Sequence, residues 1–133
     1  MNGVAGVIGV AAAEHCLGPL SQIPEGEGRT FLVPPAGHGG TAPVAVAVFH
    51  LRNGAVHATQ AACPHRGGPL ADGLVGGTTV ICPLHSRKFD LSTGAALSDG
   101  CGIATFPVRV TDTGLIMVDV EPVAAEGGNG AAP

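Results

Sequence analysis

The chain has 133 residues, of which 45% are hydrophobic and 12% are charged, as expected for a single globular domain. A net charge of −4 and the lack of a basic stripe argue against a nucleic-acid-binding protein. With four Phe and no Trp or Tyr, the core must be built from Val, Leu, Ile and Ala, and a bound metal centre would add stability to such a thin core.

Residues 1–13 carry no charged side chain and are rich in Gly, Ala and Val. This run is too short to span a bilayer, and a secretory signal would need a basic start, whereas no Lys or Arg precedes Arg29. The sequence also lacks the twin-Arg pair expected of an exported protein that carries a cofactor. We therefore expect a cytoplasmic protein without membrane insertion, in which residues 1–14 form a flexible N-terminal segment.

Short runs of aliphatic residues, separated by turns rich in Gly and Pro, then follow one another along the chain. The strongest strand pattern covers residues 44–51, where every second side chain from Val44 to His50 is predicted to share one side. Asn53-Gly54 predicts a hairpin turn that returns the chain through residues 55–61. The other expected strands cover residues 15–20, 29–33, 78–82, 86–91, 105–110 and 115–120.

No segment shows a convincing helical period, and turn signals recur roughly every eight to twelve residues. The pattern predicts an all-β barrel or sandwich over residues 15–121, followed by a disordered tail at residues 122–133, which are rich in Gly, Ala and Pro. His50 and His57 flank the predicted hairpin. We interpret both as strand histidines with a backbone or water partner, rather than as proton shuttles.

Two short loops carry the residues on which the function depends: Cys63-Pro64-His65 and Cys82-Pro83-Leu84-His85. Each loop offers one thiolate and one imidazole, close enough in sequence for a tight turn to point both at one metal centre. Two thiolates and two imidazoles can complete a zinc tetrahedron. They can also hold a 2Fe-2S cluster, with two Cys on one iron and two His on the other. The spacing alone leaves both centres open.

Glycine and proline are frequent around these loops. We expect the glycines to let the backbone approach the metal centre where a side chain would collide, and the prolines to stiffen the loops. Ordinary tight-turn chemistry would explain the same residues. The glycines in question are Gly67, Gly68, Gly73, Gly76 and Gly77, and the prolines are Pro64, Pro69 and Pro83.

The segments 63–70, 81–85 and 89–94 closely resemble the Rieske ferredoxin family, and the resemblance extends over roughly residues 17–120. In that family the two Cys bind one iron and the two His bind the other. The resemblance therefore implies a 2Fe-2S cluster with Cys63 and Cys82 on one iron and His65 and His85 on the second. It also implies an antiparallel β-sandwich base with a small cluster-binding subdomain at about residues 61–95.

High-potential members of the family add a disulfide between the two cluster loops and place Ser and Tyr hydroxyl groups near the sulfur atoms. The matching positions here are Gly68, Leu84, Arg87 and Phe89, none of which can supply these features. The resemblance thus implies the low-potential, ferredoxin-like class.

Three of the six basic residues, Arg66, Arg87 and Lys88, lie in or beside the ligand loops. They would stabilise a reduced cluster or guide an acidic partner, unless they only keep the loop tips solvated. The two remaining cysteines, Cys16 and Cys101, are expected to be buried thiols without a disulfide bond, as is usual in a reducing cytosol.

Within the family, the segments 22–29, 58–70 and 83–91 look like the small subunit of assimilatory NAD(P)H-dependent nitrite reductase. That resemblance implies an electron-transfer subunit, inactive alone, with a larger partner that contains flavin and sirohaem. The alternative is the ferredoxin component of an aromatic-ring-hydroxylating dioxygenase, which works between a flavin reductase and an oxygenase. A zinc-binding or cluster-free binding module is a third interpretation.

Overall fold

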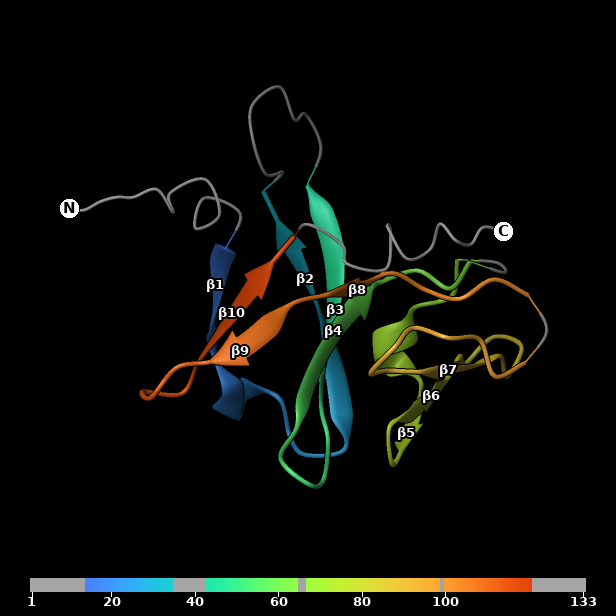
Figure 1. Cartoon of the computed structure of the whole chain (residues 1–133), viewed down its shortest axis with the longest axis horizontal. Coiled ribbons are helices and arrows are strands. Elements are labelled where there is room, and N and C mark those ends of the chain that lie inside the picture. The colour runs from blue at the N-terminus through green and yellow to red at the C-terminus, as the bar shows by residue number, and fades with distance from the viewer. Residues whose placement is uncertain (1–13, 35–42, 65–66, 99, 121–133) are drawn as a thin grey trace.

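The computed structural model describes residues 14–34, 43–64, 67–98 and 100–120, which form three antiparallel sheets and two short 3₁₀ helices (Figure 1). The segments 1–13 and 122–133, predicted to be flexible and disordered, lie outside these residues, as do His65 and Arg66. Glu14 already belongs to the first strand. No helix in the described ranges is long and apolar enough to cross a membrane.

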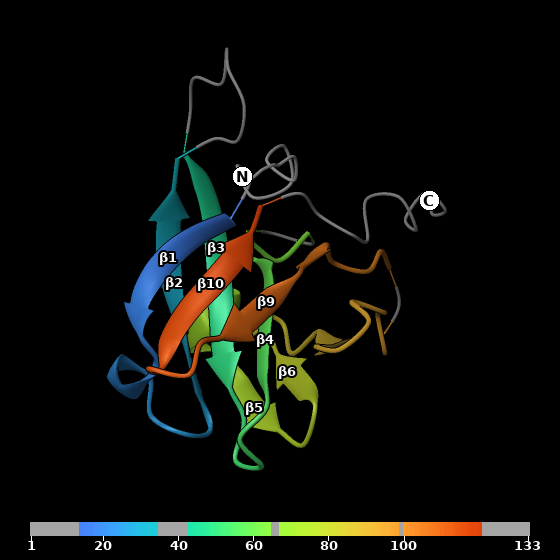
Figure 2. The same ribbon diagram turned by 60° about the vertical axis from the view of Figure 1, so that its left-hand side comes forward.

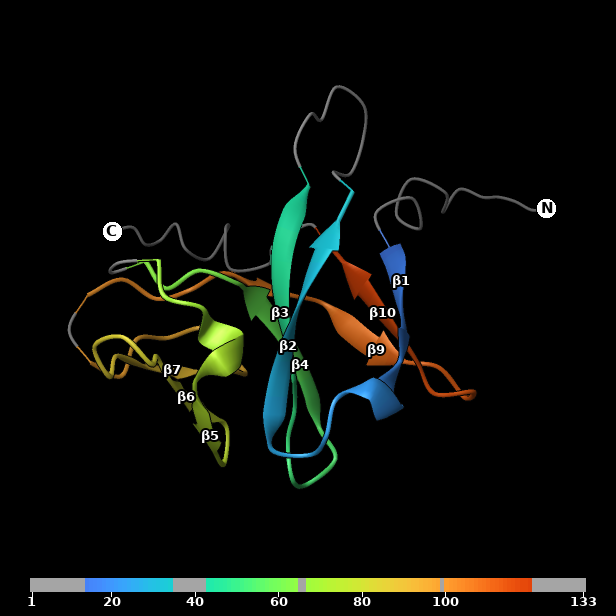
Figure 3. The same cartoon turned by 180° about the vertical axis from the view of Figure 1, so that it is seen from behind.

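The first sheet has the order β1 (Glu14–Pro19), β10 (Leu115–Asp119), β9 (Val108–Val110). The second sheet has the order β2 (Glu27–Val33), β3 (Val44–His50), β4 (Val56–Gln60), β8 (Thr105–Phe106). The third sheet consists of β5 (Leu74–Gly76), β6 (Thr79–Ile81) and β7 (Lys88–Asp90), and the 3₁₀ helices are η1 (Leu20–Gln22) and η2 (Leu70–Asp72). The predicted all-β fold is confirmed, and opposite views show the second sheet between the other two (Figures 1 and 3).

The strand predictions fail at two places, each for a local reason. The run predicted at residues 105–110 is two strands, because Pro107 has no N–H group for a sheet and the chain passes there from the second sheet to the first (Figure 2). Strand β5 was not predicted at all. It has only three residues, and the sequence predicts turns at Gly73, which precedes the strand, and at Gly76, which ends it.

Strand β3 is buried on both faces. Val46 and Val48 pack with Ile116 and Val118 of β10, between the first and second sheets. The alternate residues Ala47 and Phe49 instead face a second group of buried residues that includes the third sheet. The alternation predicted from the sequence is therefore confirmed, and the apolar run in the centre of β3 reflects residues 46–49, which are covered on both faces.

The two hairpin histidines differ in environment. His50 lies at the end of β3, and its Nδ1 is 2.8 Å from the carbonyl oxygen of Ile23, which confirms the predicted backbone partner. His57 in β4 pairs with Phe49 and is partly buried. Burial lowers the pKa of His57, and the negative charge of Asp90 opposes this effect.

Cys63, Gly67 and Gly68 hydrogen-bond to one another between β4 and η2. The Cys63 N–H donates to the Gly68 carbonyl at 2.8 Å, and the Gly67 N–H donates back to the Cys63 carbonyl at 2.7 Å. Gly67 closes the loop with a φ of 75°, in the left-handed region that favours glycine.

Residues 82–87 repeat this construction between β6 and β7. The Cys82 N–H donates to the Arg87 carbonyl at 2.7 Å, and the Ser86 N–H donates to the Cys82 carbonyl at 3.0 Å. Ser86 occupies the position of Gly67 and has a φ of 59°, the one positive φ among the described residues other than glycine. The second loop therefore has the same geometry as the first but carries a side chain at its strained position.

Exchanging the residue types at these two positions should change stability in opposite directions. No described atom lies within 4 Å of a Cβ built on Gly67, so Gly67→Ala acts through the backbone alone and should lower the free energy of unfolding by about 1 kcal/mol. Ser86→Gly should raise it by roughly 0.5–1 kcal/mol, because relief of strain exceeds the added chain entropy. Urea unfolding of matched preparations measures both changes, and a shift of the same sign in both variants would contradict this account.

His57 should make the fold sensitive to acid. Its pKa is below the ordinary 6.5 in the folded state, so below about pH 6.5 the unfolded chain binds more protons and stability falls with pH. His57→Gln should therefore flatten the loss of stability between neutral pH and about pH 5. Urea midpoints of both proteins across this range test the expectation, which fails if the two curves run parallel.

Candidate metal centre

The structure brings the two predicted cysteine ligands into one buried group. Cys63 follows β4 in the second sheet and Cys82 follows β6 in the third, and each is 2% exposed. Both belong to the same core cluster as Phe49 of β3 and Phe89 of β7. Two thiols from different sheets thus meet in an apolar interior, and neither is in a disulfide bond.

Gly68 places the first loop directly against the second. A Cβ at this position would lie 2.8 Å from Sγ of Cys82 and 2.9 Å from Cγ of Leu84. Any larger residue would push the two loops apart, so the prediction that glycine permits a close approach to the site is confirmed at Gly68.

The other predicted glycines serve the loops and turns around the site. Gly73 also has no room for a side chain, but its neighbour is the backbone carbonyl of Ile81. No described atom lies within 4 Å of a Cβ built on Gly76 or Gly77, and Gly77 has a φ of 58°. Gly76 ends β5 and Gly77 lies in the turn to β6, so for them the ordinary tight-turn interpretation holds.

The predicted histidine ligand that the structure describes lies at the surface. His85 is exposed at the tip of the second loop, beside Leu84, which is 52% exposed. His65 lies outside the described residues, so the structure places three of the four predicted ligands. Within the ranges that it describes, no three Cys, His, Asp or Glu side chains form a ready-made site for a single ion.

Gln60 fixes the entrance to the first loop and was not identified from the sequence. Its Nε2 donates to the Ala62 carbonyl at 2.7 Å, and its Oε1 accepts from the Ala104 N–H at 2.8 Å. The Gln60 N–H also donates to the Ala104 carbonyl at 3.0 Å. One polar residue at the end of β4 thereby ties the chain before Cys63 to the segment that enters β8.

The second loop is held by contacts with Leu97, Ser98 and Gly100. The Leu97 N–H donates to the Lys88 carbonyl at 2.8 Å, and the Lys88 N–H donates to Ser98 Oγ at 3.1 Å. The guanidinium of Arg87 reaches Gly100, where a Cβ would lie 3.3 Å from Nη1. Arg87 therefore lies along the loop rather than extending into solvent.

The expectation for the two remaining cysteines is half correct. Cys16 and Cys101 form no disulfide bond, as predicted, but both are exposed rather than buried. Cys16 lies in β1, at the edge of the first sheet, and Cys101 lies in the loop before β8. The sequence could not show this exposure, because an unpaired Cys is usually buried and its place in an edge strand or an outer loop depends on the fold.

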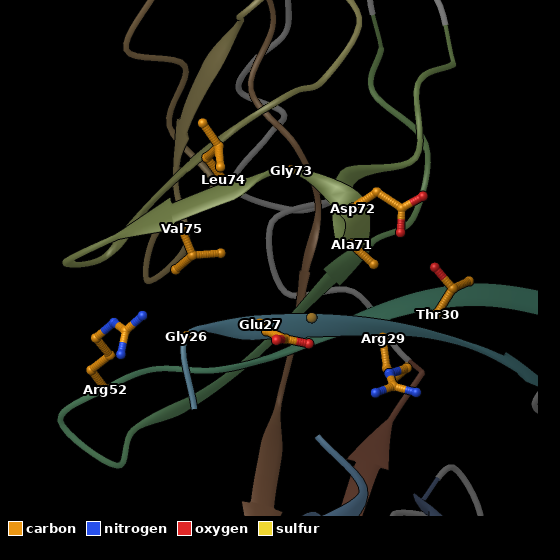
Figure 4. A pocket seen from close by; sticks show the side chains of 11 residues that line it. Gly26, Glu27, Arg29, Thr30, Arg52, Ala71, Asp72, Gly73, Leu74 and Val75 are labelled. Carbon is orange, nitrogen blue, oxygen red and sulfur yellow. The ribbon is translucent and has the colours of Figure 1, made fainter. Parts of the chain in front are cut away.

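A hollow of about 800 Å³ lies apart from the ligand loops, between β2 and the segment from η2 to β5 (Figure 4). Arg52 lies over Gly26 at one end, where a Cβ would be 3.1 Å from the guanidinium carbon. Its walls carry both signs of charge, with Glu27 and Arg29 on β2 and Asp72 on η2. The hollow contains none of the predicted metal ligands.

The described residues suit a centre with two chemically different metal positions. Two soft sulfur donors lie in the apolar interior, and an imidazole lies at the solvent side of the same loops. The absence of a side chain at Gly68 leaves space next to Sγ of Cys82. This gradient from buried sulfur to exposed nitrogen fits a cluster in which one iron has thiolate ligands and the other has imidazole ligands.

Comparisons with known proteins agree with this geometry. Residues 14–107 match the model of the Rieske [2Fe-2S] domain. A nitrite reductase [NAD(P)H] from Emericella nidulans is 39% identical over 88 residues, which cover 59% of this chain and 8% of that protein. The ferredoxin component of a naphthalene 1,2-dioxygenase system from Pseudomonas putida is 35% identical over 69 residues, which cover 50% of this chain and 65% of that protein.

Among solved structures, a candidate small subunit of NADH-dependent nitrite reductase from Mycobacterium tuberculosis superposes with a TM-score of 0.69 at 27% identity. The superposition covers 79% of this chain and 92% of the other. The domain match, the fold and the paired loops together show that the chain belongs to the Rieske [2Fe-2S] family and that its cofactor is a 2Fe-2S cluster.

Proposed function

We propose that Cys63 and Cys82 bind one iron of the cluster and that His65 and His85 bind the other. The observation that supports this assignment is the contact between the two matching loops, in which both cysteines are buried and Gly68 lies against the Cys82 sulfur. When bound, the cluster supplies one-electron transfer.

The surrounding residues shield one side of this site from water and leave the other side exposed. Phe49, Phe89 and their buried neighbours surround the cysteine side and exclude water from it. His85 is exposed, so the histidine side is the edge at which an electron can leave or enter over a short distance. Gly68 and Leu84 cannot form a disulfide, and Arg87 and Phe89 carry no hydroxyl group, which supports the low-potential class.

We further propose that the protein is the electron-transfer subunit of an assimilatory NAD(P)H-dependent nitrite reductase. The relatives from Emericella nidulans and Mycobacterium tuberculosis support this role. Because the chain spans 8% of the fungal reductase, a larger partner with flavin and sirohaem would bind the nicotinamide cofactor and reduce nitrite to ammonia. The small subunit would be inactive alone.

A second candidate is the ferredoxin component of an aromatic-ring-hydroxylating dioxygenase. The specific observation in its favour is the naphthalene dioxygenase ferredoxin, of which the chain covers a much larger share than of the fungal reductase. In that role the protein would carry electrons from a flavin reductase to an oxygenase.

Removal of a ligand should abolish the cluster. Cys63→Ser and His85→Ala each remove one of four proposed ligands and should leave protein without stoichiometric iron and acid-labile sulfide. Cys16→Ser is the matched control, because Cys16 is exposed in β1, and it should retain the full cluster. Iron and sulfide analysis with low-temperature EPR of the reduced proteins measures the outcome, and a Cys63→Ser or His85→Ala protein that keeps the full cluster would refute the ligand assignment.

Deletion of the gene in the source organism tests the physiological role. Loss of growth on nitrate or nitrite as the sole nitrogen source, restored by the wild-type gene but not by Cys63→Ser, is the result expected of the reductase subunit. Normal growth on nitrate and nitrite, together with loss of growth on an aromatic carbon source, would contradict the nitrite reductase role and support the dioxygenase role.

A further inference from the structure

One face of the third sheet carries an exposed row of mostly apolar side chains. Leu74 pairs with Ile81 across β5 and β6, and Ile81 pairs with Lys88 across β6 and β7. Leu97 extends the row, because its N–H donates to the Lys88 carbonyl at 2.8 Å and the adjacent residues Phe89 and Ala96 form a bridge. We name these four residues, Leu74, Ile81, Lys88 and Leu97, the outer row.

The neighbouring row of the same sheet faces the core. It consists of Val75, Val80, Phe89 and Ala96, which pack in the cluster that also contains the two buried cysteines. Successive side chains of a strand point to opposite faces, so the outer row faces away from that core. Figure 4 shows this for β5, from which Leu74 and Val75 leave in opposite directions.

The composition of the outer row is unusual for a solvated face. An antiparallel sheet that packs one face on a core normally has polar residues on the other. Here Leu74 is 74% exposed, Leu97 is 54% exposed and Ile81 is partly exposed. Clustered apolar side chains at a surface are typical of a site that another protein covers.

The outer row also adjoins the second ligand loop. Ile81 immediately precedes Cys82, and Lys88 immediately follows Arg87, so both ends of the loop begin in the row. The exposed Leu84 lies within that loop. A protein bound on the row would therefore lie beside the second ligand loop of the proposed cluster site.

The charge in the row indicates the chemistry of the partner. Lys88 is exposed at the centre of the row, and its ammonium forms no hydrogen bond or ion pair with any described residue. Asp90, on the same face, already accepts hydrogen bonds from the N–H and hydroxyl of Ser92. A carboxylate from outside is the group that would neutralise Lys88.

We propose that the outer row is the docking surface for the electron-transfer partner, which presents an apolar patch with a carboxylate opposite Lys88. This inference rests on the proposed role as an electron carrier. Because the apolar side chains are solvated in the free protein, their burial would favour association, while the ion pair would set the orientation.

The test compares outer-row variants with a matched control outside the row. Leu74→Thr and Leu97→Thr remove exposed apolar surface, and Leu32→Thr does the same in β2, where Leu32 is 71% exposed. Each holoprotein is assayed for binding and for partner-dependent turnover with the large subunit of nitrite reductase, and separately with the reductase and oxygenase of an aromatic-ring dioxygenase.

We expect each row variant to raise the dissociation constant and the KM for the partner about tenfold, whereas Leu32→Thr leaves them unchanged. The visible and EPR spectra should be those of the wild type. Lys88→Glu should weaken binding most at low salt.

Equal behaviour of the row variants and Leu32→Thr would overturn the docking surface while leaving the proposed function intact. If the wild type serves only the dioxygenase proteins, the nitrite reductase role fails and the same variants test the row there. A wild type that binds neither partner overturns both proposals. Sedimentation of the wild type as a dimer that Leu74→Thr dissociates would assign the row to a second copy of the chain instead.

Discussion

The rest of the structure depends on the burial of β3 on both of its faces. One face closes the sandwich with β10, and the other supports the third sheet and the two cysteine loops. Phe49 is the largest fully buried side chain on this strand, and it also restricts its neighbours, since a Cβ on Gly28 would come within 2.7 Å of its ring. In a chain with four Phe and no Trp or Tyr, one strand thus supplies part of both cores.

Because of this arrangement, the candidate metal site has one buried side and one exposed side. The cysteine side belongs to the core beneath β3, whereas the described histidine lies at the surface. A centre that gains one negative charge on reduction would therefore lie where dielectric screening is weak on one side and strong on the other. The hydrogen bonds of Gln60, Lys88 and Ser98 hold the loops at this boundary.

The sequence was informative where chemistry and geometry coincide in a few adjacent residues. The central strand was predictable from the run Val44 to His50, and its hairpin from the Asn53-Gly54 turn. The two predicted ligand loops were recognisable from their Cys-Pro pairs. Features that depend on contacts across the sheets were not predictable. Strand β5 exists because β6 offers it a pairing edge, the role of Gln60 depends on a chain segment more than forty residues away, and the exposure of Cys16 is set by its place in an edge strand. The same is true of the outer row, whose members are spread over four segments.

The two cysteine loops come from different sheets, so a bound cofactor would affect which part of the protein unfolds first. Cys63 is attached to the second sheet and Cys82 to the third, so a cofactor that joins them cross-links two units that are otherwise connected by packing and by the chain between them. Such a link forms only when both loops are folded, so it holds the two sheets together in the native state. With the cofactor absent, the third sheet becomes the unit with the fewest constraints, and its amide hydrogens would exchange by local opening well before those of β3.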